Sequence, residues 1–544
     1  MDVKKRISFL SYAVNGAGVG HVVRQVAIHK WLRRLCSAGN IKSEHWFLTT
    51  SEADGLVFRE GFAAFKLPSK TIVEAAGIDK IAYLAMAKQW VWTSITVLRP
   101  DVLIVDTFAE GSFHELPAVL DVVGTSVLVQ RPVKDSFTLR PGHLSLLQAY
   151  DRVIVPEHED DVPQLREVMG VQSSRLRFVG PVVRADAFAA FTRTSARQRL
   201  GVDSDVRCVL VTGGGGGDDT IDALFDAVEA AVGSDERVHL VLAAGPLFRG
   251  RPRRGPRRTM FVDHDLAEHA AAFDVAVSAA GFNTIHELLL FGVPLLVLPQ
   301  DKIADDQGAR ARRYAERGAV VVTSLEAVGP DLRALLDDEP RRAALSDAAR
   351  EVMPTNHAKD AAIAILQTQL PPSLAAALDR LVTDDVVEAT VALGAELKDV
   401  VELALALAGH RDRAGLEALQ LQRAVELCRR TEASPLVLVQ LAEQLDKKWH
   451  VNDLDAHLVA LCGGANSGQH HTVVEFLKAC TPERHVDAAL LIDALQQAAL
   501  RLSFSGWGLS QALVRFKTTR PPGPVLVQQA GSVNAARLQV SVNR

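Results

Sequence analysis

Short runs of β-branched and other apolar residues recur through the first two-thirds of the chain, and segments of helical spacing separate them. Uninterrupted apolar runs of this kind are typical of strands that are buried on both faces, as in a parallel sheet covered by helices. The runs occupy residues 7–12, 47–50, 102–106, 126–129, 152–155, 208–212, 239–244, 275–278 and 294–298. Their alternation with helical segments predicts an α/β fold built from doubly wound, Rossmann-like parallel sheets.

The runs fall into two groups, because the first group closes near residues 178–184 and the next run begins at Cys208. After Pro371 and Pro372 the runs disappear, and Leu/Ala-rich segments of helical spacing replace them. We therefore expect three domains, namely a Rossmann-like domain over 1–184, a second one over 185–370, and an all-α domain with a polar tail over 371–544. Two consecutive doubly wound domains usually bind their ligand in the cleft between them, at the carboxyl ends of both sheets.

Composition excludes several classes of protein. Of the 544 residues, 48% are hydrophobic and 23% charged, which indicates a globular core rather than disorder. A net charge of −5 argues against a surface built as a whole to bind nucleic acid. The five cysteines form no CxxC pair or Cys/His cluster, so we expect neither a disulfide framework nor a zinc site. The longest apolar stretch, 288–298, is too short to span a bilayer, so we expect a cytoplasmic protein, with peripheral attachment to a membrane as an alternative.

A glycine-rich loop, residues 15–21, follows the first apolar run and leads into the first helical segment. Gly18 and Gly20 let the backbone approach a ligand closely, and the start of the helix offers free N–H groups. The alternating glycines do not match the dinucleotide pattern GxGxxG. His21 stands at the exit of the loop, where its imidazole is expected to face the cleft. A structural histidine that caps the helix is the alternative.

Asp106 ends one of the buried runs. A carboxylate at the carboxyl end of a central strand lies at the mouth of the cleft. There it can accept the Nδ1 proton of His21, which fixes the tautomer and raises the basicity of the other ring nitrogen. The alternative is that Asp106 only caps the following helix.

Five consecutive glycines, Gly213–Gly217, come directly after the run 208–212 and precede a helical segment. This order predicts a cradle of backbone N–H groups for an anion. The loop lacks the Gly-Lys-Ser/Thr end of a P-loop, which disfavours an ordinary NTPase. A solvent-exposed loop without a ligand is the alternative.

The segment 278–288 combines several such features. A strand ends at Gly281, a helix begins near Asn283 and Thr284, and Glu287 lies in its first turn. Free N–H groups at the helix start suit a diphosphate, and a carboxylate one turn later suits ribose hydroxyls.

Asp306 and Gln307 follow the next strand, so their side chains are expected to reach the hydroxyls of a sugar. Routine charge at a helix start is the alternative for Glu287 and Asp306 taken singly. Their joint arrangement makes that interpretation unfavourable.

These motifs resemble those of the GT-B glycosyltransferases, in the family that contains the peptidoglycan N-acetylglucosaminyltransferase and, more distantly, the UDP-dependent small-molecule glycosyltransferases. The family carries an AGxxTxxE-type segment, a GxP turn and a DQ pair, which are similar to Ala280-Gly281, Asn283-Thr284, Glu287, Gly292-Val293-Pro294 and Asp306-Gln307. Its GxGHxxR opening and its interdomain junction are similar to residues 18–24 and 180–184. The resemblance covers about residues 5–370. Phe282 and His286 are not typical of the family, and the third domain has no counterpart in its minimal form.

The resemblance implies a role for each matching residue. His21 would be the general base, with Asp106 as its partner, beside an acceptor-side loop at Gly18 and Gly20. The donor-binding residues would be Gly213, Gly214 and Gly215 with Gly281, Asn283 and Thr284 for the diphosphate, Val262 for the base, Glu287 for the ribose, and Asp306 and Gln307 for the sugar.

These roles describe an inverting transfer. His21 would deprotonate an acceptor hydroxyl or amine as it attacks the anomeric carbon opposite the leaving nucleoside diphosphate, in a single displacement. Helix N–H groups and the glycine loop would stabilise the leaving group, so we expect neither a metal nor a cofactor. The donor would be a UDP- or TDP-sugar.

Partners are less well specified. The acceptor would be a small molecule, a lipid-linked molecule or a peptide, and the helical domain would form a homodimer or bind a protein partner. The loop 249–258 carries six arginines and is either a solvated loop or a site for an anionic acceptor, nucleic acid or lipid headgroup. Two other functions stay open on the same scaffold, a sugar-nucleotide 2-epimerase or hydrolase and a non-catalytic nucleotide-sugar-binding protein.

Overall fold

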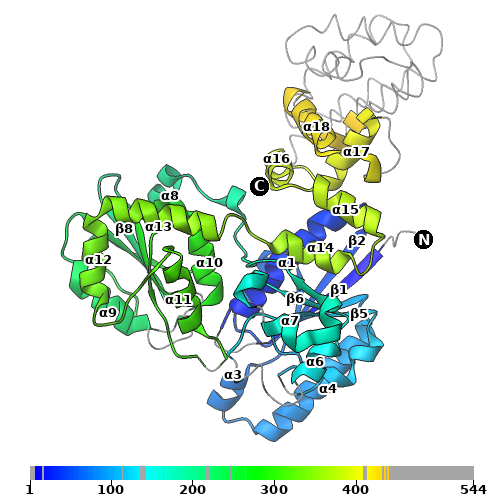
Figure 1. Ribbon diagram of the computed structural model, residues 1–544, viewed down its shortest axis with the longest axis horizontal. Helices are drawn as coiled ribbons and strands as arrows, with labels where there is room; N and C mark the ends of the chain where they lie inside the picture. The colour runs from blue at the N-terminus through cyan, green and yellow to red at the C-terminus, as the bar shows by residue number, and fades with distance from the viewer. Residues whose placement is uncertain are drawn as a thin grey trace, which may run out of the picture. The chain divides into compact units, whose positions relative to one another are not determined.

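The computed structural model describes residues 6–439, except 15–17, 113, 135, 137–142, 163, 216–220, 246, 249, 264, 303, 409–412, 432–433 and 437 (Figure 1). Contacts divide the chain into two compact units. The first unit comprises Met1–Arg33 and Ile41–Leu370, and the second comprises Arg34–Asn40 and Pro371–Arg544. The first unit contains both of the expected parallel sheets.

The first sheet has seven strands, all parallel, in the order β3-β2-β1-β4-β5-β6-β7. Their bounds, in chain order, are β1 Arg6–Ala13, β2 Lys42–Thr49, β3 Ala63–Lys66, β4 Val102–Asp106, β5 Thr125–Val129, β6 Arg152–Val155 and β7 Leu176–Phe178. The chain winds outward from β1 in one direction and from β4 in the other. The loops after β1 and β4 therefore meet at the switch point of the sheet, where doubly wound folds bind ligands.

The second sheet repeats this topology with six parallel strands in the order β10-β9-β8-β11-β12-β13. Their bounds are β8 Arg207–Thr212, β9 Val238–Ala243, β10 Arg258–Phe261, β11 Val275–Ala279, β12 Leu295–Leu298 and β13 Val321–Val322. The loops after β8 and β11 meet at its switch point. The predicted pair of doubly wound sheets is confirmed.

The connections between strands are mostly helical. The helices of the first unit are α1 Gly20–Ala38, α2 Gly55–Arg59, α3 Lys70–Ala75, α4 Lys80–Leu98, α6 His143–Gln148, α7 Gln164–Met169, α8 Arg193–Leu200, α9 Ile221–Val232, α10 Phe282–Leu290, α11 Gln307–Glu316, α12 Val328–Asp337, α13 Glu339–Val352 and α14 Ala358–Leu366, with the end of α1 belonging to the second unit.

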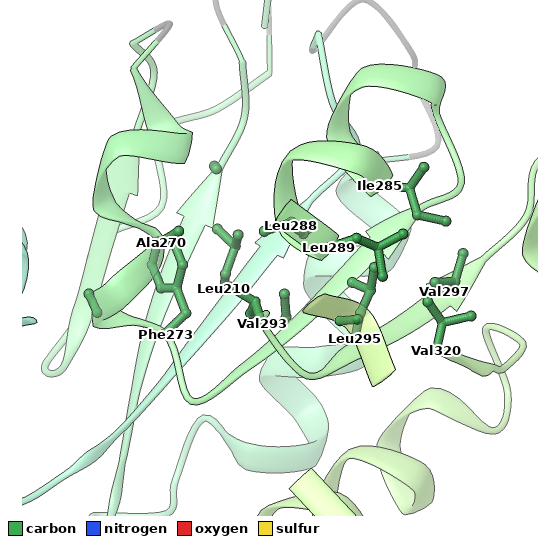
Figure 2. Close-up of a cluster of buried hydrophobic side chains, with 14 of the residues drawn as sticks. Leu210, Ala270, Phe273, Ile285, Leu288, Leu289, Val293, Leu295, Val297 and Val320 are labelled. Atoms are coloured by element: carbon green, nitrogen blue, oxygen red, sulfur yellow. The ribbon is translucent and has the colours of Figure 1, made fainter. Parts of the chain in front are cut away.

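Alternate residues of the central strands enter different cores, which explains their uninterrupted apolar runs. In β8, Leu210 packs in a cluster with Ile285, Leu288 and Leu289 of α10 (Figure 2). Its neighbours on the strand, Val209 and Val211, belong to another cluster, formed with residues of α9 and α12. Burial on both faces leaves only the ends of the strands for a ligand site.

The strand prediction was incomplete at the sheet edges. Each central strand overlaps a predicted run, although the run 47–50 covers only the end of β2. The strands β3, β10 and β13 were not predicted, and β7 was read only as the close of the first domain. These four strands are the outer strands of the two sheets.

The described part of the second unit is helical. From residue 371 to 439 it contains no strand, and its helices are α15 Pro372–Leu381, α16 Asp384–Ala392, α17 Leu397–Ala408 and α18 Ala418–Thr431. The remainder of the predicted helical domain and its polar tail, from residue 440, lie outside the described residues. Among the helices that the structure describes, none has the length and apolar character needed to cross a membrane.

Candidate active site at the switch points of the two sheets

His21 lies in the first turn of α1, directly after the loop that follows β1. Its Nδ1 is 2.6 Å from Oδ1 of Asp106, and its ring packs against Phe108 with the centroids 5.3 Å apart. Nδ1 is therefore the nitrogen that carries the shared proton, and Nε2 is left to act on a substrate. Of the glycine loop, Gly18 and Gly20 are described, while residues 15–17 are not.

Asp106 is fully buried at the carboxyl end of β4. Besides His21, its carboxylate accepts hydrogen bonds from Arg24 (Nε at 3.0 Å and Nη2 at 2.8 Å), from Nε2 of Gln25 at 3.0 Å and from the hydroxyl of Thr107 at 2.8 Å. Burial raises the pKa of Asp106, but the charges of Arg24 and His21 outweigh it and hold the pKa well below its usual range. Asp106 therefore stays ionised and accepts hydrogen bonds from five donor groups.

The environment of His21 favours its neutral form. Burial lowers its pKa, the charge and hydrogen bond of Asp106 raise it, and the charges of Arg131 and Arg24 lower it again. The balance is a pKa below the ordinary histidine value. At neutral pH His21 is therefore uncharged, which is the form that a general base requires.

The donor-side residues lie at the second switch point. Gly281 precedes α10, which begins at Phe282, so Asn283 and Thr284 occupy its first turn. They line a pocket whose other walls are formed by Val19, Val23, Arg184, Thr212, Gly214, Gly215, Ala243, Gly245, Asp263, Leu266 and Glu287. Backbone N–H groups at the start of α10 and in the glycine loop thus border one pocket, as an anion site requires.

The glycine loop of this pocket needs its glycines for conformation and for space. Gly214 has φ = 91°, a region that disfavours side chains. Gly245, in the loop after β9, leaves room for the glycine loop, because a Cβ at this position would lie 2.4 Å from the carbonyl oxygen of Gly214. Gly216 and Gly217, the end of the predicted five-glycine run, lie outside the described residues.

Glu287 points into the same pocket from the side of α10. The backbone N–H groups of Arg184 and Ala185, in the segment that joins the two sheets, hydrogen-bond to its carboxylate. Burial raises the pKa of Glu287, and the charge of Arg184 and these hydrogen bonds lower it, with a net rise. Glu287 therefore holds the interdomain segment at the edge of the pocket, a contact that the sequence did not indicate.

The two switch points meet at the start of α1. Nδ2 of Asn283 donates to the carbonyl oxygen of Gly20 at 3.1 Å, next to His21. Phe282 lies between Arg24 and Arg310, with their guanidinium carbons 5.1 and 5.2 Å from the ring centroid. The predicted base and the predicted diphosphate-binding residues therefore lie side by side.

The remaining predicted donor residues do not line this pocket. Asp306 caps α11 through its contact with the N–H of Ala309 at 2.8 Å. The side-chain oxygen of Gln307 accepts from the N–H of Gln300 at 3.0 Å, and Val262, after β10, is more than half exposed. Gly213 lies beside the pocket, immediately before Gly214.

Asp305, rather than Asp306, faces the first sheet's domain. It pairs with Arg131 at 2.5 Å and with Arg310 at 2.6 Å. Burial raises the pKa of Asp305, but the charges of Arg310 and Arg131 outweigh it and leave the pKa well below its usual range. Sequence reasoning missed this ion pair, because the adjacent carboxylates Asp305 and Asp306 are equivalent in the pattern.

A second cavity has a volume of about 310 Å³. It adjoins Thr107 and Phe108, and its remaining lining is Lys70, Ala109, Glu110, Gly111, Ser112, Gln130, Val133, His143 and Leu146. Its lining includes both polar and apolar side chains, and no sequence pattern indicated it beyond the position of Asp106.

The arginine-rich loop is partly held by ion pairs. Arg253 contacts Asp222, Asp226 and Glu229 of α9 at 3.0, 2.5 and 2.7 Å, and Arg258 lies 3.2 Å from Glu229. The expectation of a solvated loop therefore does not hold for these two arginines. Arg249 lies outside the described residues.

No group of three or more His, Cys, Asp or Glu side chains is arranged to hold a metal ion in the part of the chain that the structure describes.

Comparison with known proteins agrees with this geometry. Residues 208–353 match the glycosyltransferase family 28 C-terminal domain. The UDP-N-acetylglucosamine–N-acetylmuramyl-(pentapeptide) pyrophosphoryl-undecaprenol N-acetylglucosamine transferase of Staphylococcus carnosus is 27% identical over 224 residues, which are 40% of this chain and 58% of that protein. The enzyme of the same name from Thermus thermophilus is 31% identical over 188 residues, 32% of this chain and 50% of that protein. The chain thus spans about half the length of these curated relatives.

A solved structure from Listeria monocytogenes, assigned as a UDP-N-acetylglucosamine 2-epimerase, superposes with a TM-score of 0.50 at 15% identity, covering 67% of this chain and 96% of that one. At this identity the likeness shows a shared fold. Together, the matched domain, the relatives and the two doubly wound sheets show that this chain resembles the nucleotide-sugar glycosyltransferases of GT-B fold, and among them the peptidoglycan N-acetylglucosaminyltransferases.

Proposed function

We propose that this chain is an inverting glycosyltransferase that moves a sugar from a nucleoside-diphosphate sugar to an acceptor hydroxyl or amine. The observation that carries the proposal is the contact between Asn283 and the backbone of Gly20. It places a buried His–Asp pair beside a pocket bordered by a helix N-terminus and a glycine loop. A base next to an anion site is the arrangement that transfer from a diphosphate leaving group needs.

The donor would lie in the pocket at the second switch point. N–H groups of the Gly214–Gly215 loop and of the start of α10 would bind the diphosphate, and Glu287 would bind the ribose. Val262 would contact the base, and Asp306 with Gln307 would contact the sugar after local rearrangement. Because the curated relatives use UDP-N-acetylglucosamine by name, UDP-sugars are the donors to test first.

His21 would take the proton of the acceptor as the acceptor attacks. Asp106 fixes Nδ1 as the protonated nitrogen, so the lone pair of Nε2 is the one that faces the reacting atoms. The anomeric carbon gains a bond to the acceptor oxygen or nitrogen on one face and loses its bond to the diphosphate on the other. Fixed N–H dipoles would stabilise the departing charge, and we therefore propose that transfer proceeds without a divalent metal.

The acceptor would occupy the cavity beside Thr107 and Phe108, because this cavity adjoins the ring that packs on His21. Its mixed lining suits a molecule with both polar and apolar parts. The relatives are named for a pyrophosphoryl-undecaprenol acceptor, so we propose a lipid-linked acceptor. A peripheral position at the cytoplasmic face of a membrane would follow from such an acceptor.

A donor screen that measures release of free nucleoside diphosphate tests this function. We expect release from a UDP-sugar that depends on an added lipid-linked acceptor and that persists in excess EDTA. Release without any acceptor would instead indicate an epimerase or hydrolase. Donor binding without release, with any acceptor, would indicate a binding protein.

A further inference from the structure

We propose that a chain of hydrogen bonds in the first sheet's domain, buried from His29 to Asp106, positions Asp106 and tunes His21, with every proton directed toward the Asp106 carboxylate. The proposal rests on the proposed function, because it concerns the base of that reaction. Starting at the end far from the carboxylate, the members of this relay are Ser43, His45, His29, Ser11 and Gln25.

The relay is assembled from one helix and two strands. His21, Gln25 and His29 are spaced four residues apart, so they lie on one face of α1. Ser11 is in β1 and His45 is in β2, which is hydrogen-bonded to β1. The relay therefore runs under α1, between the helix and the sheet.

The direction of the first link follows from the carboxylate. Asp106 is ionised and can only accept hydrogen bonds. The group of Gln25 that lies 3.0 Å from Oδ2 of Asp106 is therefore the amide NH₂. This orientation leaves the amide oxygen of Gln25 toward Ser11, whose hydroxyl must donate to it at 2.7 Å.

The hydroxyl of Ser11 has one proton, and that proton is used by Gln25. Nε2 of His29, 2.8 Å from the same oxygen, must therefore be the donor. Burial, followed by the charges of His45 and Arg33, keeps the pKa of His29 well below its usual value, so the ring is neutral and its Nδ1 carries no proton. The tautomer of His29 is thereby determined.

The tautomer of His45 follows from that of His29. Its Nδ1 lies 2.9 Å from Nδ1 of His29, and since the latter is unprotonated, His45 must donate. Burial and the charge of Arg33 lower the pKa of His45 to about 3, so this ring is also neutral. Its Nε2 then accepts from the hydroxyl of Ser43 at 2.9 Å.

A purely structural role would not need this ordering. The two imidazoles lie among Phe9, Phe47 and Phe62, a setting in which apolar side chains would pack without a polar network. A buried polar relay costs free energy unless every member is satisfied. Every member of the relay has a hydrogen-bond partner, and its last donor is hydrogen-bonded to Asp106.

Cutting the relay is expected to raise the pKa of His21. Each donor to Asp106 disperses the carboxylate charge and weakens its stabilisation of a protonated His21. The charged groups that face His21 are Asp106, Arg24 and Arg131. Removing the last donor of the relay leaves these three in place and makes Asp106 a stronger partner, so the pKa of His21 should rise.

The first test needs no substrate. Two-dimensional NMR of ¹⁵N-histidine in the full chain reads the tautomers directly. The relay predicts a proton on Nε2 of His29 and on Nδ1 of His45. The opposite tautomer at His29 would overturn the proposed direction, whether or not the protein transfers a sugar.

The second test measures the pKa of His21 by the same NMR signals. In Gln25→Met, which keeps length and removes the donor, we expect a rise of about one pKa unit, the size of a modest charge interaction. In Ser11→Ala, which cuts the relay one step earlier, we expect a smaller rise. Ser126→Ala is the matched control, because this buried strand serine bonds to Asp151 instead.

The two tests separate the inference from the proposed function. If the pKa of His21 in Gln25→Met equals that in Ser126→Ala, the relay does not tune the base and the inference is wrong. If the pKa rises while no donor is ever turned over, the relay stands and the proposed function fails. Where transfer is measurable, the base limb of its pH profile should move to higher pH with the NMR value. If Gln25→Met does not fold, the wild-type tautomers and Ser11→Ala decide the outcome.

Discussion

Asp106 is the residue on which the site depends most, because five donors converge on one buried carboxylate. Its position after β4 was predictable, since a carboxylate that ends a buried run faces the cleft of a doubly wound fold. The donors other than His21 were not predicted. The spacing of His21, Gln25 and His29 was a usable signal, whereas the approach of His45 from another strand depends on register that a single sequence does not specify.

At the residue scale we expect Asp106→Asn to lower the thermal unfolding midpoint at neutral pH. The substitution removes the charged partner of buried Arg24, and breaking such a pair costs about 3–5 kcal/mol. Because the pKa of Asp106 is depressed in the folded state, its stabilisation is present above the unfolded value of about 3.9 and is lost as the pH falls through the folded value. The difference from wild type should therefore shrink below about pH 4.

Thermal unfolding followed over a series of pH values checks this prediction. Asp151→Asn is the control, because Asp151 accepts from the N–H and hydroxyl of Ser126 rather than from an arginine. Equal midpoints for Asp106→Asn and Asp151→Asn at neutral pH would contradict the assignment of a charge-dependent role to Asp106.

At the scale of elements, the sequence identified the central strands and missed the outer ones. Central strands such as β8 are buried on both faces and therefore appear as apolar runs. The outer strands β3, β7, β10 and β13 are short, and Leu176 in β7 is their one buried residue, so they carry no such run. Edge strands are commonly short and polar for this reason, and pattern alone does not distinguish them from loops.

One face of α4 is exposed and apolar. Met86, Trp90 and Val97 lie along one side of the helix and are 73%, 51% and 76% exposed, while another side is buried. The helix contains lysines but no Asp or Glu. If the acceptor is lipid-linked as proposed, this face suits the surface of an anionic membrane.

We therefore expect the double variant Met86→Glu/Val97→Glu to sediment several-fold less with vesicles containing phosphatidylglycerol, because the new carboxylates meet apolar and anionic lipid. Leu325→Glu, at a 42% exposed leucine of the second sheet's domain, is the control. Equal sedimentation of both variants would show that α4 does not contact the membrane.

Arg253 holds the arginine-rich loop against α9 through ion pairs with three carboxylates. We expect Arg253→Ala to release the loop, so that trypsin cleaves faster after Arg254 and Arg257. The loss in stability should be modest, about 1 kcal/mol, because two of the carboxylates are well exposed. Arg237→Ala removes an exposed pair with Asp235 and serves as control. An unchanged cleavage rate in Arg253→Ala would contradict the fastening role.

At the scale of the whole molecule, the two sheets form one compact unit, whereas the helices after Pro371 group with the last turn of α1. Within this second unit the N–H of Lys398 donates to Ser37, and Arg413 donates to the carbonyl oxygen of Ala38. No proposed donor-binding residue belongs to it. The sequence predicted the helices but not that α1 contributes to their unit, because packing between segments so distant in sequence leaves no local pattern.

A chain that ends at Leu370 should therefore keep its affinity for a nucleotide sugar and lose thermal stability, since the end of α1 loses its partners. Isothermal titration with the donor and thermal unfolding measure the two properties. Loss of donor binding in a folded truncated chain would place part of the donor site in the helical unit.

In the proposed function His21 performs the chemistry while the pocket beside it holds the donor. The most direct measurement compares donor affinity and sugar transfer in His21→Ala and Glu287→Gln. We expect His21→Ala to bind the donor as wild type does and to transfer about 10²–10⁴-fold more slowly, the usual contribution of a general base. Glu287→Gln should instead lose donor affinity. Transfer by His21→Ala at the wild-type rate would show that His21 is not the base.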